Sequence, residues 1–209
     1  MALINFDGVT FQYGDSTTPV INNFSASIGM GQKVAIKADS GTGKTTLLRL
    51  LLGFEELKSG DIRYQGTSIA SDNFATIRKA TAWLPQDLNI GDGTVGEVID
   101  RIFEFQYNRS KKPGGDQIKS KLSLLGLSSS LLPKPFRELS TGQRQRVGLV
   151  LCHLLDRPLM LLDEPTSALD EDSKQKAIDL LFSDNGQTII STTHDPFWLE
   201  RCDKIIELK

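Results

Sequence analysis

A glycine-rich turn near the N-terminus constrains the fold of this chain more than any other sequence feature. Residues 38–45 read ADSGTGKT and match the phosphate-loop pattern [AG]xxxxGK[ST] through Ala38, Gly43, Lys44 and Thr45. The apolar stretch KVAIK precedes the turn, and KTTLLRLLLG follows it with helical composition. This order places backbone N–H groups at the start of a helix, where the helix dipole favours phosphate. The turn therefore predicts a strand, a nucleotide-phosphate site and a helix in succession.

The chemistry of the turn assigns roles to its polar residues. Lys44 would bridge the β- and γ-phosphates of a nucleotide, and the Thr45 hydroxyl would ligate Mg²⁺. The alternative is a glycine-rich turn before a helix with no ligand. The residues predicted to contact the nucleotide here are Ser40, Gly41, Thr42, Gly43, Lys44, Thr45 and Thr46.

Two residues of the turn depart from its commonest form. Ala38 replaces the usual first glycine, and it is tolerated if the backbone keeps φ below zero, because the Cβ then costs little. Asp39 brings a carboxylate beside the phosphates, and at 4 Å the repulsion would be about 4 kcal/mol for an effective dielectric of 20. We therefore expect the Asp39 side chain to face solvent.

Strand and helix patterns alternate along the chain. Residues 1–36 alternate apolar and polar positions, which is typical of strands and hairpins, and the helix from Lys44 is expected to stop at Gly53. Residues 87–143 contain VGEVIDRIFEFQY and DQIKSKLSLLGL, both with helical spacing, so a mostly helical insertion is expected there. Further helices and strands are predicted at 143–155, 159–162, 172–182, 188–192 and 204–208. This alternation predicts an α/β fold with a parallel sheet covered on both faces.

Composition narrows the class of protein. The 209 residues carry a formal charge of −2, with lysine and arginine scattered along the chain, which argues against nucleic acid as the main partner. Cys152 and Cys202 have no metal-ligand or redox spacing and are typical of reduced cytosolic thiols. The chain has no recognisable signal peptide and no apolar run near the ~18 residues needed to span a bilayer. Any work at a membrane would therefore be done from the cytosol, through a partner.

An acidic pair follows an apolar run in the second half of the chain. The sequence LMLLDEP places Asp163 and Glu164 directly after a predicted buried strand. Such a strand delivers its last residues to the carboxyl edge of a parallel sheet, where ligands of these folds bind. Asp163 would then hold Mg²⁺, and Glu164 would act on the attacking water as a general base. An ordinary buried strand that ends at an acidic turn is the alternative.

A third motif, ELSTGQRQR, lies shortly before LMLLDEP and brings a family into view. Its residues 139–143 resemble the LSGGQ signature of ATP-binding cassette (ABC) proteins, and the resemblance extends over essentially the whole chain. The resemblance implies a P-loop NTPase core, an N-terminal antiparallel β subdomain and a helical signature subdomain. It also implies one ABC ATP-binding domain over 1–209, in which 87–143 is the helical subdomain and 1–86 with 144–209 form the rest.

The same resemblance assigns three more residues to the nucleotide site. Tyr13 in FQYG would stack on adenine, and a surface tyrosine in a turn is the alternative. Gln86 in LPQD would sense Mg²⁺ and the attacking water. His194 in STTHD would contact the γ-phosphate and hold the water in line. Glu164, His194 and Gln86 are thus the expected catalytic residues, and Thr45, Gln86 and Asp163 the expected Mg²⁺ ligands.

The signature implies a second subunit. Ser140, Gly142 and Gln143 resemble residues that close over the γ-phosphate bound by a partner subunit, and Asp170 in SALD would communicate across that interface. A head-to-tail dimer with ATP sandwiched between subunits is therefore expected. Thr141 departs from the signature, because a β-branched residue resists positive φ and adds bulk near the partner's nucleotide.

The leading hypothesis is an Mg²⁺-dependent ATP hydrolase that powers an ABC transporter. The chain would sit on the cytoplasmic face of the membrane, bound to separate permease subunits through a surface that includes residues 86–99. Within it GTVGEVI resembles efflux-type members, so export is weakly favoured. Two alternatives remain: a degenerate cassette that binds nucleotide as a regulatory module, and a soluble ABC ATPase that does not transport.

Overall fold

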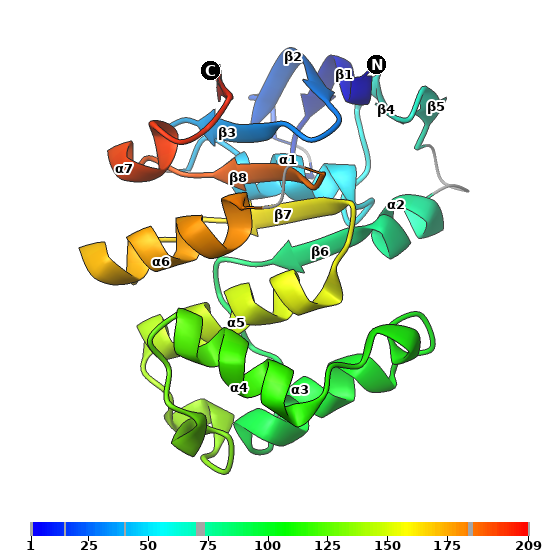
Figure 1. Ribbon diagram of the computed structural model, residues 1–209. Helices are drawn as coiled ribbons and strands as arrows, with labels where there is room; N and C mark the ends of the chain where they lie inside the picture. Colours follow the sequence, from blue (N-terminus) through cyan, green and yellow to red (C-terminus); the bar gives the residue numbers. More distant parts are fainter. Residues whose placement is uncertain (1, 15, 40, 70–73, 184–185, 209) are drawn as a thin grey trace.

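The chain folds into an antiparallel sheet and a parallel sheet (Figure 1), and one hydrophobic cluster contains residues of both. The computed structural model describes residues 2–14, 16–39, 41–69, 74–183 and 186–208. The antiparallel sheet has the order β2-β1-β4-β5 and the parallel sheet the order β6-β7-β8-β3-β9.

The antiparallel sheet is formed by β1 (Ala2–Phe11), β2 (Ile21–Gly29), β4 (Ser59–Tyr64) and β5 (Thr67–Ser68). In β1 the apolar side chains at alternate positions, such as Ile4 and Phe6, are buried, as expected for a sheet with one face on the core. The register between β1 and β2 shifts after Phe6, because Gly8 takes a φ of 59° and opens an irregularity there.

The parallel sheet contains β3 (Lys33–Lys37), β6 (Thr81–Leu84), β7 (Leu159–Asp163), β8 (Thr188–Thr192) and β9 (Lys204–Glu207). Its strands β7 and β8 are buried at every position, which explains the continuous apolar run LMLL in β7. All of its pairings are parallel, so the carboxyl ends of β3, β7 and β8 meet at one edge.

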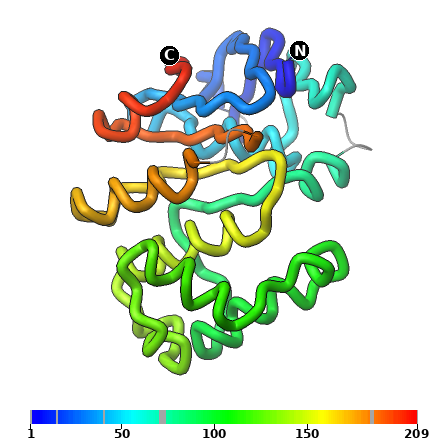
Figure 2. Tube along the Cα trace, in the orientation of Figure 1, coloured from blue at the N-terminus to red at the C-terminus, as the bar shows by residue number. Residues whose placement is uncertain are grey.

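Helices cover both faces of the parallel sheet. The helices are α1 (Lys44–Leu51), α2 (Phe74–Ala80), α3 (Val95–Glu104), α4 (Gly115–Leu124), α5 (Thr141–Leu155), α6 (Glu171–Phe182) and α7 (Pro196–Leu199). Short 3₁₀ turns occur at Arg109–Lys111, Ser129–Leu131 and Phe136–Glu138. Figure 2 traces the chain out of the sheet after β6, through α3 and α4, and back through α5.

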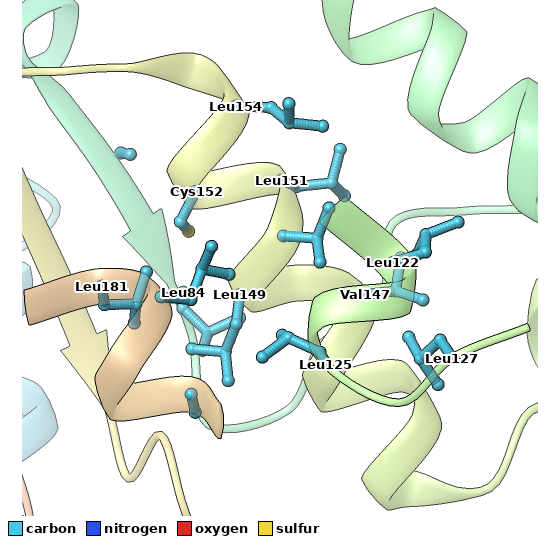
Figure 3. Close-up of a cluster of buried hydrophobic side chains, with 14 of the residues drawn as sticks. Leu84, Leu122, Leu125, Leu127, Val147, Leu149, Leu151, Cys152, Leu154 and Leu181 are labelled. Atoms are coloured by element: carbon cyan, nitrogen blue, oxygen red, sulfur yellow. The ribbon is translucent and has the colours of Figure 1, made fainter. Parts of the chain in front are cut away.

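Two hydrophobic clusters hold these layers together. One lies between the antiparallel sheet, α1 and one face of the parallel sheet. The other joins the opposite face to α3, α4, α5 and α6, with Leu84, Leu149, Leu181 and Leu125 meeting in its centre (Figure 3). Because α5 contributes to this second cluster and also carries the signature residues, the signature is anchored directly to the sheet.

Most of the predicted elements are confirmed. The first helix ends as expected at Gly53, which has a left-handed φ of 65°. Just beyond it, the Phe54 N–H donates to the Arg49 carbonyl at 2.9 Å and closes the end of the helix. The predicted strands and helices after residue 143 match β7, β8, β9, α5 and α6.

The sequence interpretation was incomplete between residues 59 and 84. It did not find β4, β5, α2 or β6 there, and it grouped β3 with the N-terminal hairpin, whereas β3 pairs in parallel with β8 and β9. Short strands that finish a sheet begun elsewhere depend on partners distant in sequence, so local periodicity did not reveal them. Among the described residues, no helix combines the length and apolarity needed to cross a membrane.

Candidate functional site

The phosphate loop lies between β3 and α1 and is closed by Lys44. The Lys44 Nζ donates to the Ala38 carbonyl at 2.7 Å and to the Asp39 carbonyl at 3.0 Å. Gly43 has a φ of 90°, and a Cβ there would lie 2.7 Å from the Val20 side chain, so only glycine suits the position. Ser40 lies outside the described residues.

The two departures in the loop are accommodated. Ala38 does not have a positive φ and packs beside the hydrophobic cluster, so its Cβ causes no strain. Asp39 is exposed, as expected, while its carbonyl accepts hydrogen bonds from Lys44 and from the Thr42 hydroxyl. The Asp39 side chain is thus in contact with solvent, as predicted.

A cleft of about 530 Å³ opens beside the loop. Its lining joins residues of the first strand region, the loop, α1 and the ends of β6 and β7, namely Tyr13, Val20, Gly41, Gly43, Lys44, Thr45, Thr46, Gln86, Asp163 and Glu164. Most of these residues were predicted from separate motifs, and the fold brings them into one space.

Asp163 is held by two hydroxyls at the edge of the sheet. The Thr45 hydroxyl donates to Asp163 Oδ2 at 2.6 Å, and the Thr192 hydroxyl donates to Asp163 Oδ1. Asp163 is 1% exposed, so these bonds replace the water that the carboxylate loses on burial. Thr192 was not predicted; it is one of three hydroxyl residues in the strand sequence TIIST, and nothing local sets it apart from Thr188 and Ser191.

Glu164 has an unusual backbone conformation that aims its carboxylate into the cleft. Its φ is 49°, a left-handed value that is uncommon for residues other than glycine and that concentrates at functional sites. Its N–H donates to the Thr192 carbonyl at 3.0 Å. Its Oε1 lies 3.9 Å from the Lys44 Nζ and 3.3 Å from the His194 Nδ1. The predicted lysine, glutamate and histidine thus converge on one point.

Tyr13 and Gln86 lie at the rim of the cleft. The Tyr13 hydroxyl is 2.9 Å from the Thr46 hydroxyl, and its ring meets Phe11 edge to face with centroids 4.7 Å apart. Tyr13 is 49% exposed, so part of its ring is accessible to a stacking partner. Gln86 is exposed and lines the same cleft.

The signature residues lie elsewhere. Ser140 caps α5 in a reciprocal arrangement: its hydroxyl accepts from the Gln143 N–H at 3.2 Å, and its own N–H donates to Gln143 Oε1 at 3.1 Å. Gly142 packs so tightly that a Cβ would lie 2.6 Å from the Ala168 carbonyl oxygen. Neither these residues nor Asp170 line the cleft around Lys44.

Thr141 corrects one expectation. It is the first residue of α5, is exposed and does not have a positive φ, so the predicted conflict between a β-branched residue and positive φ does not arise. The replacement of glycine by threonine therefore only adds a larger side chain at the exposed start of the helix.

Asp170 caps the next helix, α6. Its Oδ1 accepts from the Ser173 N–H at 2.8 Å, and this backbone hydrogen bond is the main reason why the pKa of Asp170 lies below its usual value. The ionised carboxylate is thus stabilised at the start of α6.

The family of the chain is indicated by comparison with known proteins. The family model described as ABC transporter matches residues 21–167. The ATP-dependent lipid A-core flippase of Sodalis glossinidius is 31% identical over 210 residues, which cover 97% of this chain and 36% of the flippase. The chain thus spans about a third of that relative's length.

For two further proteins the match spans a larger share of their own length. The energy-coupling factor transporter ATP-binding protein EcfA1 of Staphylococcus aureus is 32% identical over 211 residues, which cover 98% of this chain and 77% of EcfA1. The dimeric structure of a bacterial ABC transporter cassette superposes with a TM-score of 0.83 at 25% identity, over 99% of this chain and 94% of the cassette.

Proposed function

The chain belongs to the ABC transporter family and has its ATPase cassette, and from this premise we propose that it hydrolyses ATP in the cleft beside Lys44 to power transport through separate membrane subunits. One observation carries the proposal. Glu164, which is 7% exposed, presents its carboxylate to both Lys44 and His194 at the mouth of the phosphate loop.

Each group at the cleft would have its own role in phosphoryl transfer. The backbone N–H groups at the start of α1 and the Lys44 ammonium would bind the β- and γ-phosphates. Glu164 would take a proton from the attacking water, and His194 would hold that water in line with the γ-phosphate. Tyr13 would stack on the adenine.

The donor set beside the loop suits Mg²⁺. The Thr45 hydroxyl and the Asp163 carboxylate lie 2.6 Å apart, and the Gln86 amide lines the same cleft, so the oxygen donors that a small hard cation prefers are gathered there. When bound, the ion would neutralise charge that develops on the phosphates. Thr45, Asp163 and Gln86 would hold it.

A second ATP-binding subunit would complete each site. Ser140, Gly142 and Gln143 lie on the exposed start of α5, outside the cleft that contains Lys44. Phosphate contacts from this helix end therefore require a neighbouring chain, in which its N-terminal dipole would face the partner's ATP. The dimeric cassette with the same fold supports this arrangement.

The membrane partner would bind through residues 86–99 on the cytoplasmic side of the membrane. This segment joins β6, at the edge of the cleft, to α3, so movement of a permease subunit could reach Gln86 directly. A flippase and an energy-coupling factor transporter are both among the relatives, so the comparisons favour neither direction of transport. Export rests on the GTVGEVI sequence alone.

Replacement of Glu164 tests the proposed hydrolysis. Glu164→Gln keeps the shape of the side chain and removes the base, so we expect ATP turnover to fall by about 10²-fold or more while ATP binding persists. Phosphate release and nucleotide affinity should be measured on both chains, with dimer formation followed by light scattering. A wild-type chain that binds ATP without hydrolysing it, even with its permease, would indicate a regulatory module instead.

A further inference from the structure

Gln145 connects the signature helix to the turn that contains the catalytic glutamate. It lies in α5, is 7% exposed, and its amide is fully engaged. Its Nε2 donates to the Glu164 carbonyl at 2.6 Å, and its Oε1 accepts from the Ala168 N–H at 3.1 Å. A single side chain therefore spans the turn from its first residue to its last.

The Glu164 backbone needs such support. With a φ of 49°, its peptide occupies a conformation that a glutamate adopts only when its surroundings impose it. On the N-terminal side the Glu164 N–H is held by Thr192, and on the C-terminal side the carbonyl is held by Gln145 and by the Ser167 hydroxyl at 3.1 Å. Loss of the Gln145 bond would leave that carbonyl, among the described residues, with the Ser167 hydroxyl and the Ser167 N–H at 3.3 Å as its donors.

The same helix touches the same turn a second time. The Gly142 Cα approaches the Ala168 carbonyl so closely that even a methyl group would collide with it. The start of α5 and residues 164–168 are thus fastened by close packing and by two hydrogen bonds. These contacts connect the signature end of α5 physically to the Glu164 peptide.

We propose that Gln145 is a positioning residue that couples the signature helix, which contacts the partner's ATP, to the catalytic glutamate of its own site. This inference rests on the proposed function, because it assumes that Glu164 is the base and that residues 140–143 reach a second subunit. Gln145 is buried and does not line the cleft, so we expect no direct contact between its amide and the ATP bound there.

Gln145→Met tests the role, because methionine keeps the length of the side chain and removes both hydrogen bonds. We expect kcat to fall about tenfold or more, with the Kd for ATP changed less than about twofold, because the phosphate loop is untouched. Gln175→Met is the matched control: its amide bonds Asp179 on α6, so the same change should leave kcat within about twofold.

Gln145→Glu adds a readout that a purely structural role would not move. An ionised glutamate can accept from Ala168 but cannot donate to the Glu164 carbonyl, whereas a protonated one can do both. Burial raises the pKa of such a carboxyl, so the kcat of Gln145→Glu relative to wild type should rise as the pH is lowered from about 8 to about 6. The ratio for Gln145→Met should stay flat.

Hydrogen exchange of the peptide that covers residues 164–170 separates this inference from the proposed function. If wild type hydrolyses ATP and Gln145→Met keeps its kcat, or raises KM at constant kcat, the coupling role is overturned and the ATPase stands. If wild type fails to hydrolyse ATP, the proposed function is wrong, and hydrogen exchange then tests the link between α5 and the Glu164 turn by itself. Faster exchange in Gln145→Met than in Gln175→Met supports that link, and equal exchange refutes it.

Discussion

Two glycine positions of the family's motifs carry other residues in this chain, and the backbone at each position explains why. Ala38 and Thr141 replace glycines of the usual motifs, yet neither has a positive φ, so neither position requires glycine for its backbone. Gly43 and Gly142 do require it, because a Cβ at either would lie within 3.0 Å of neighbouring atoms. The substitutions are tolerated where the backbone permits a side chain, and glycine is kept where it does not.

Asp39 should have little influence on ATP binding. Its side chain is exposed and screened by water, so Asp39→Asn should change the affinity for ATP less than about tenfold, or roughly 1.4 kcal/mol. Titration of a nucleotide analogue into both chains measures this. A tenfold tighter complex for the asparagine variant would mean that the carboxylate does reach the phosphates.

Gly142 should be intolerant of the smallest side chain. Gly142→Ala places a methyl group 2.6 Å from the Ala168 carbonyl oxygen, and relief of that clash should cost about 1–3 kcal/mol of unfolding free energy. Urea denaturation measures the loss.

Gly115→Ala is the matched control, because Gly115 begins α4 and a Cβ there meets nothing within 4 Å. Alanine is the better helix former, so this variant should be as stable as wild type or up to about 1 kcal/mol more stable. Equal stability of the two alanine variants would contradict the close approach at Gly142.

At the scale of elements, the N-terminal caps of α3 and α5 fix where these two helices begin. Ser140 and Thr94 each cap a helix by exchange of hydrogen bonds with the third residue of the helix. The Thr94 N–H holds the pKa of Glu97 below its usual value. The contribution of this bond to stability is therefore present at neutral pH and is lost as the pH falls through the lowered pKa.

Removal of the Thr94 cap should destabilise the chain by about 1 kcal/mol. Thr94→Ala leaves the Glu97 N–H without its hydroxyl acceptor, and the urea midpoint should fall accordingly. Ser120→Ala on the exposed side of α4 is the control and should change the unfolding free energy by less than about 0.5 kcal/mol. If Ser120→Ala lowered the unfolding free energy by as much, the effect of Thr94→Ala would not be specific to the helix cap.

At the scale of the whole molecule, the cleft and the signature are built on different parts of the fold. The cleft lies at the carboxyl edge of the parallel sheet, whereas the signature begins α5 and is rooted in the other hydrophobic cluster. On the proposed function, each chain would therefore contribute its cleft to one ATP site and its signature to another. The division of the chain at residues 87–143 stays a prediction, and α3, α4 and α5 share their cluster with the sheet.

Turnover should therefore depend on protein concentration. If two chains complete each site, ATP hydrolysis per chain should rise with concentration and level off when dimers dominate, while ATP binding is already complete in dilute samples. Steady-state turnover measured across a wide dilution series, with mass photometry on the same samples, provides the comparison. A constant rate per chain, with monomers at every concentration, would refute the shared site.

The sequence by itself predicted most residues of the proposed site and the order of most elements. Phosphate binding at a helix start needs glycines, lysine and threonine at fixed spacing, and a buried parallel strand needs a continuous apolar run, so ADSGTGKT and LMLLDEP could be interpreted locally. The strands β4 and β6 could not, because their partners are distant in sequence.

Only the tertiary structure decided how those residues meet. The left-handed backbone of Glu164, the hydroxyl of Thr192 on Asp163 and the amide of Gln145 across the turn depend on strands and helices that come together after the chain has folded. Thr192 is one of three polar residues in TIIST, and Gln145 lies between two arginines in QRQR, so local patterns do not distinguish them from ordinary polar positions. Motifs name the chemistry, and the packing of β7, β8 and α5 sets the geometry in which that chemistry can work.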